Sequence, residues 1–153
     1  MMRSLLLGFV LLVVFLLLSD GVQAGSNEAV ITGKTSSGRT ELEARVQDIT
    51  GQFRSVTLTI DGKTMEFRFD ESDDVRTTVI RDVENDVFVL LMEGEDKVFR
   101  LWMVPGSEKV LEKTNGSYQS TFAAVIEATD PRESGKWTLT PRITIGCRLD
   151  YSI

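Results

Sequence analysis

The chain has 153 residues, of which 42% are hydrophobic and 26% charged, a composition typical of globular proteins. It carries 17 Lys and Arg against 23 Asp and Glu, a net charge of −6, and it has no histidine. The missing imidazole excludes Ser-His and Cys-His nucleophile pairs, a histidine general base and His-ligated zinc or haem. The acidic balance argues against nucleic acid as a partner, because binding to nucleic acid neutralises phosphates with Lys and Arg.

The N-terminus has the three parts of a secretory signal. Arg3 supplies a positive charge, Leu5–Leu18 form an apolar run, and the small residues Val22 and Ala24 precede the expected cleavage site. An apolar run of that length spans about 21 Å as a helix, less than the roughly 30 Å of a bilayer's hydrocarbon core. We therefore expect residues 1–24 to be cleaved near Ala24, which leaves the protein periplasmic or secreted with no stable membrane insertion. An uncleaved signal anchor is the alternative.

The first part of the expected mature chain allows more than one assignment. Residues 25–39 are small and polar apart from one apolar triplet, and we expect a flexible lead-in with one short strand at most. Residues 40–153 then form a single antiparallel β domain. Within it, residues 40–53 have the alternation of a strand and also the spacing of a short helix near 41–50 that begins with a capping box. The strand agrees better with the remaining sequence.

The clearest hairpin lies between Ser55 and Phe69. Alternate residues on both sides of Asp61-Gly62 are apolar, and this dipeptide favours a two-residue type I′ turn, whose central positions need positive φ. Such a turn pairs Leu58 with Met65, so that apolar residues face one another across the two strands.

The rest of the chain continues in short strand-like runs. Strands are expected at 75–81, 87–92, 98–103, 109–113, 117–128 and 143–153, with tight turns at 93–96 and at Asn115-Gly116. The run 87–92 and much of the run 98–103 are apolar on both faces, which predicts burial on both sides. The fold class is therefore all-β, a small antiparallel meander of about eight to ten strands that is closed as a barrel or folded as a sandwich.

Cys147 is the only cysteine, so no disulfide can form within the chain and the core must supply the stability. It shares an alternating apolar face with Ile145 and Leu149 in the last strand. We expect a buried, unreactive thiol, because reactive cysteines need exposed and electropositive surroundings. A disulfide to another molecule is the alternative.

The acidic run Asp70–Asp74 places three oxygen ligands at alternate positions, as in an EF-hand calcium loop. The match fails where that loop needs Gly and Glu, because Val75 and Arg81 occupy those positions. No motif indicates a cofactor, and no pair of carboxylates is marked as buried in a cleft. We therefore expect neither a cofactor nor enzyme activity; a carboxylate-dependent enzyme is the alternative.

The segment 129–137 is the strongest candidate for a binding loop. A turn at Asp130-Pro131 is followed within a few residues by Arg132, Lys136 and Trp137. Trp and Arg are enriched at binding hot spots because they combine large contact area with a polar group. Asp130, Arg132, Lys136 and Trp137 are the candidate binding residues. The competing interpretation is that Trp137 covers the end of the barrel and Arg132 pairs with Asp130 or Glu133.

The string Ser134-Gly135-Lys136-Trp137-Thr138 resembles the Ser-Gly-x-x-Tyr loop of the periplasmic inhibitors of C-type lysozyme, which are small exported β-barrels. Here the aromatic residue is Trp and comes one position earlier, and the likeness covers these residues alone. The resemblance implies a binding or inhibitory module whose anionic surface suits a basic partner in the envelope or outside the cell. A small outer-membrane β-barrel is the alternative, on the strength of the alternating C-terminal strand.

Overall fold

The structure is a computed structural model that describes residues 28–46, 53–68, 76–82, 85, 87–94, 97–133 and 138–152. Every regular element in these ranges is a β-strand, and the strands form one antiparallel sheet. They are β1 (Glu28–Lys34), β2 (Thr40–Val46), β3 (Phe53–Ile60), β4 (Lys63–Arg68), β5 (Arg76–Asp82), β6 (Val87–Glu93), β7 (Val98–Met103), β8 (Lys109–Lys113), β9 (Ser117–Ala128) and β10 (Ile143–Ser152). The predicted all-β fold is confirmed.

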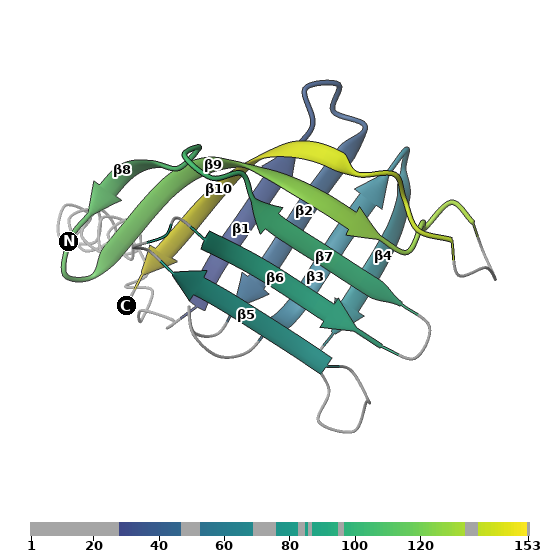
Figure 1. Ribbon diagram of the computed structural model, residues 1–153, viewed down its shortest axis with the longest axis horizontal. Helices are drawn as coiled ribbons and strands as arrows, with labels where there is room; N and C mark the ends of the chain where they lie inside the picture. Colours follow the sequence, from purple (N-terminus) through teal and green to yellow (C-terminus); the bar gives the residue numbers. More distant parts are fainter. Residues whose placement is uncertain are drawn as a thin grey trace, which may run out of the picture.

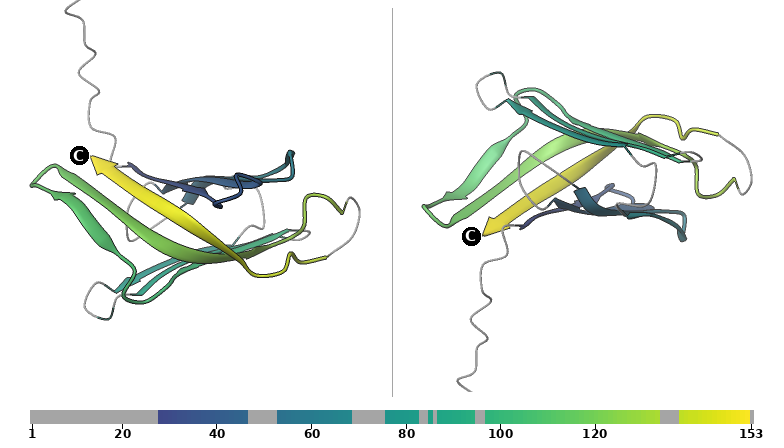
Figure 2. Two further views of the ribbon diagram at one scale, coloured as in Figure 1. Left: turned by 90° about the horizontal axis from the view of Figure 1, so that it is seen from above. Right: turned by 90° about the horizontal axis from the view of Figure 1, so that it is seen from below.

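The ten strands curl into a half-barrel (Figure 1). Their order across the sheet is β4-β3-β2-β1-β10-β9-β7-β6-β5, and β8 pairs with β9 outside this path. The first and last strands of the chain are neighbours, because β1 pairs with β10 and Glu28 faces Ser152. Figure 2 shows β1–β4 as one layer and β5–β7 as another, with β9 and β10 running diagonally from one layer to the other.

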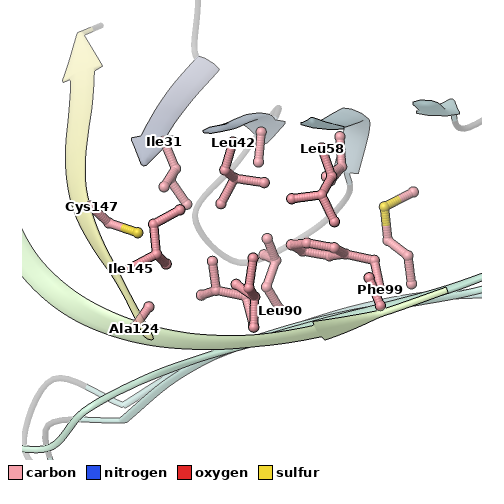
Figure 3. Packing of buried hydrophobic residues seen from close by; sticks show 14 of the residues in the cluster. Ile31, Leu42, Leu58, Leu90, Phe99, Ala124, Ile145 and Cys147 are labelled. Atoms are coloured by element: carbon pink, nitrogen blue, oxygen red, sulfur yellow. The ribbon is translucent and has the colours of Figure 1, made fainter. Parts of the chain in front are cut away.

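The hydrophobic core fills the space between the two layers (Figure 3). Ile31, Leu42 and Leu58 point from the N-terminal strands towards Leu90 and Phe99 of the opposite layer, and all five are buried. Burying a side chain of this size contributes about 1.5–3 kcal/mol before its conformational entropy is subtracted. The inward rows of the strands therefore hold the half-barrel together without a disulfide.

The predicted β3–β4 hairpin is confirmed in turn and register. Asp61 and Gly62 both have positive φ, at 50° and 76°, as a type I′ turn requires. Leu58 pairs with Met65 across the hairpin. Cys147 is also buried as predicted, and burial raises the pKa of its thiol to about 12.

The helix considered near 41–50 is wrong for its described part, because Thr40–Val46 is strand β2. Its residues are alternately buried and exposed, and β2 pairs with β1 on one side and β3 on the other. Pairing on both edges satisfies the backbone groups that a helix would satisfy internally. Residues 47–50 lie outside the described residues.

The short strand that the sequence allowed within residues 25–39 is present: Glu28–Lys34 is strand β1, between β2 and β10. Ala29 and Ile31 are buried in the core. One of its small residues serves packing, since a Cβ atom on Gly33 would lie 3.0 Å from Ile145 Cδ1 and 3.1 Å from Cys147 Sγ.

The prediction that β6 and β7 are buried on both faces is wrong. In β6, inward residues such as Leu90 are buried, whereas outward residues such as Val89 and Leu91 are half-buried. The described residues place a packing layer on the inner face alone. Half-exposed apolar side chains therefore remain on the outer face.

Candidate functional site

The candidate loop follows β9 at one end of the half-barrel (Figure 1). Its two ends are joined: Thr129 forms a β-bridge with Leu139, and the Asp130 amide donates a 2.7 Å hydrogen bond to the Thr138 carbonyl. Thr129 also exchanges two hydrogen bonds with Val98 of β7, one through its hydroxyl and one through its amide, both 2.9 Å. The base of the loop is therefore part of the sheet's hydrogen-bonding network.

Asp130 and Arg132 form a close ion pair at this base. The Asp130 carboxylate is buried and accepts hydrogen bonds from Arg132 Nε at 2.8 Å, from Arg132 Nη2 at 2.6 Å and from the Arg132 amide at 2.9 Å. Two guanidinium bonds to the two carboxylate oxygens make a bidentate pair, which fixes the side chain in direction as well as distance. The competing interpretation, in which Arg132 pairs with Asp130, is confirmed for this contact.

The same guanidinium extends to the other half of the sheet. Arg132 Nη1 donates a 2.9 Å hydrogen bond to Asp61 in the β3–β4 turn, and Arg39 Nε donates to the other Asp61 oxygen at 2.6 Å. Arg39, Asp61, Arg132 and Asp130 thus contact one another in this order with alternating charge, and we call these four residues the ion clasp. It connects the loop after β9 with a turn that lies 71 residues away in the sequence.

The ion clasp lowers the pKa of both carboxyl groups below the ordinary value of 3.8. For Asp130 the main cause is the hydrogen bond from the Arg132 side chain; for Asp61 it is the hydrogen bond from Arg39, followed by that from Arg132. Both carboxylates are ionised at neutral pH, and each is held by guanidinium donors. The clasp therefore lacks the protonated carboxyl group that general-acid chemistry would need.

Two of the four candidate binding residues, Asp130 and Arg132, are brought together by the structure. The other two, Lys136 and Trp137, lie outside the described residues. The acidic run 70–74 also lies outside them. Across the ranges that are described, no group of three or more His, Cys, Asp or Glu side chains is placed to hold a metal ion.

Sequence reasoning missed a second Trp–Arg pair, on the outer face of the sheet. The Arg142 guanidinium carbon lies 5.5 Å from the centroid of the half-buried Trp102 ring, within cation–π range. Trp102 belongs to a cross-strand row of outward apolar residues that continues through Val89 to Ile80, which is 50% exposed. The sequence signal for this row is the two-sided apolar pattern of β6 and β7, which by itself predicts burial on both faces.

No helix in the described ranges is long and apolar enough to cross a bilayer. No protein-family model, curated protein or solved structure matches this chain.

Proposed function

We propose that this protein is an exported binding or inhibitory module without catalytic chemistry, and that it binds its partner through the loop between Thr129 and Thr140. The observation that carries the proposal is the anchoring of this loop. Its ends are joined by the bond from Asp130 to Thr138, and Arg132 ties it to Asp61 in the opposite layer. A loop whose base is held on a rigid scaffold loses less conformational entropy on binding than a loop with free ends.

The anchoring also divides the roles of the four candidate residues. Asp130 and Arg132 satisfy one another, so their contribution is to position the loop. Lys136 and Trp137 are the residues proposed to contact the partner, because a Trp side chain offers the large contact area of a hot spot. The net charge of −6 favours a basic partner protein in the envelope or outside the cell.

The test compares capture by three forms of the mature protein, immobilised and exposed to envelope extract, with a C-type lysozyme as a defined basic probe. They are wild type, Trp137→Ala and Ile80→Ala. Ile80 is a matched control, because it is an exposed apolar side chain on the outer face of β5. We expect wild type and Ile80→Ala to retain the same basic protein, and Trp137→Ala to bind it at least about tenfold more weakly.

Two outcomes would contradict the proposal. Equal binding by Trp137→Ala and wild type would remove the loop as the contact site. If neither the extract nor the lysozyme yields a protein that wild type binds at low salt, the basic partner is wrong. Export is tested separately by mass spectrometry of the protein from the cell envelope and medium, where we expect an N-terminus at Gly25.

A further inference from the structure

A groove of about 630 Å³, lined mainly by polar and charged residues, lies on the outer face of the sheet, away from the loop. It crosses four neighbouring strands, β3, β2, β1 and β10. The outward side chains that line it are Thr32, Lys34, Glu41, Glu43, Thr57, Thr59 and Arg148, together with the backbone at Gly146. The volume is within the range of small-molecule sites in proteins.

Gly146 leaves the groove open at its β10 end, because no side chain stands there. It occupies an outward position in β10, directly opposite Lys34 of β1. A Cβ atom at Gly146 would meet only the Lys34 carbonyl oxygen, at an ordinary 3.7 Å, and its φ is not in the left-handed region. Packing and backbone conformation would both accept a side chain here. Glycine inside a strand weakens it, and one use of glycine there is to let a ligand approach closely.

The groups around the groove select the chemistry of a ligand. One cross-strand row runs Thr57, Glu43, Thr32 and Arg148, and so presents hydroxyl, carboxylate, hydroxyl and guanidinium groups at the strand spacing of about 4.8 Å. No hydrogen bond of the Thr32 or Thr57 hydroxyl is formed within the described part of the chain. Each can therefore both donate to and accept from a ligand.

The charges of the groove are balanced and already oriented. Lys34 Nζ donates to Glu41 at 2.7 Å, and Arg148 donates to Asp150 at 2.8 Å and to Gln119 at 2.8 Å. Two cations and two carboxylates line the groove. Glu41 and Glu43 would repel an anionic ligand, and Lys34 and Arg148 would repel a cationic one. The lining side chains that point outward include no aromatic or aliphatic residue to favour an apolar ligand.

We propose that this groove binds a neutral polyhydroxylated ligand, a saccharide chain that lies across the strands. Alternating donors and acceptors on an oriented row complement sugar hydroxyls, each of which donates one hydrogen bond and accepts others. The affinity rests on hydrogen bonds in an open groove, which are individually modest in water. The proposal is independent of the loop and of any protein partner.

The test is a nuclear magnetic resonance titration of the isotope-labelled mature protein with three neutral probes, maltohexaose, cellohexaose and N-acetylglucosamine hexamer. The variant Gly146→Val places a side chain in the β10 end of the groove. Thr144→Val is its control, because Thr144 is an exposed, outward residue of β10 that does not line the groove. Thr32→Val with Thr57→Val removes two hydroxyls at nearly constant shape.

We expect at least one saccharide to shift the amide signals of Gly33, Lys34 and Gly146 in wild type and in Thr144→Val. The same saccharide should bind at least about tenfold more weakly to Gly146→Val and to the double threonine variant. The proposal is overturned if all three probes leave these amides unshifted at millimolar concentration, or if Gly146→Val binds as wild type does. It is also overturned if inorganic phosphate shifts these amide signals more than any saccharide does, because the groove would then prefer anionic ligands.

Discussion

Gly33 and Gly146 lie on neighbouring strands, and the same residue type serves opposite purposes at the two positions. Gly33 faces the core, where a Cβ atom would come within 3.0 Å of Ile145 and 3.1 Å of Cys147. Those neighbours are themselves buried, so they have little room to move. Gly146 faces outward, where a methyl group has space.

This difference predicts opposite effects of one substitution. Gly33→Ala should lower the free energy of unfolding by about 1–2 kcal/mol through overpacking. Gly146→Ala should leave it unchanged or raise it by about 0.5 kcal/mol, because alanine restricts the unfolded chain. Urea unfolding, followed by circular dichroism, measures the free energy of unfolding of both variants. The dependence of this free energy on urea concentration should be the same as in wild type if only stability changes. Equal losses for the two variants would show that the crowding at Gly33 does not matter.

Residues close in sequence were the predictable part of the candidate site. The pairing of Asp130 with Arg132 follows from a turn that brings positions two apart together, and it was among the interpretations of the sequence. The contact from Arg132 to Asp61 was not, because it crosses 71 residues and depends on how the two layers meet. Asp61 was singled out only as a turn residue, and that local role is correct as well.

At the scale of elements, turn chemistry was a reliable guide and apolar pattern a weaker one. The Asp61-Gly62 turn fixes its own hairpin, because positive φ at two adjacent positions is rare outside type I′ turns. Thr40–Val46 was ambiguous because one run of residues satisfied both strand and helix spacing. Pairing with β1 and β3 is what makes this segment a strand. The sequence did not indicate that pairing, because β1 lies in a segment expected to be mostly flexible.

Strand β8 stands outside the main order of the sheet, and all five of its residues are exposed. Its ladder with β9 shifts register between Val110 and Glu112, a bulge that distorts the edge. Two copies pairing edge to edge in antiparallel fashion about Leu111 would place Lys109 opposite Lys113. Like charges facing across a ladder destabilise it, so we expect these lysines to oppose self-association at this edge.

Replacing Lys109 and Lys113 together by Val should therefore promote self-association through β8. The expected result is a sedimentation coefficient that rises with concentration for the Val variant more than for wild type, measured by sedimentation velocity. A variant with Arg at both positions keeps the charges and serves as the matched control. A Val variant that sediments like the Arg variant at every concentration would show that the bulge alone protects the edge.

At the scale of the whole molecule, the chain closes on itself at two separate places. β1 pairs with β10 along seven residue pairs, which joins the two ends of the described chain. The ion clasp joins the layers at the β3–β4 turn, through Asp61 and Arg132. Neither link has a local signature in the sequence, because each depends on the curvature of the complete sheet. The number of strands was therefore predictable, while their order was not.

The ion clasp makes stability depend on pH in a direction that its pKa values fix. Asp61 and Asp130 have folded-state pKa values below the ordinary 3.8, so the folded protein binds fewer protons there than the unfolded chain. The clasp therefore stabilises the fold above about pH 4, and this contribution is lost as the pH falls through the folded-state values. Salt should weaken it, because Arg39 and Arg132 are partly exposed.

Asp61→Asn isolates this contribution, because Asn-Gly also favours a type I′ turn and preserves the hairpin. We expect the variant to melt at a lower temperature than wild type at neutral pH, and the gap to close as the pH falls below about 4. Asp150→Asn is the control, since Asp150 pairs with Arg148 inside one strand and joins no separate parts of the fold. Thermal melts across this pH range measure both variants. If the gap for Asp61→Asn stays constant from neutral to acid pH, ionisation of Asp61 does not hold the two layers together.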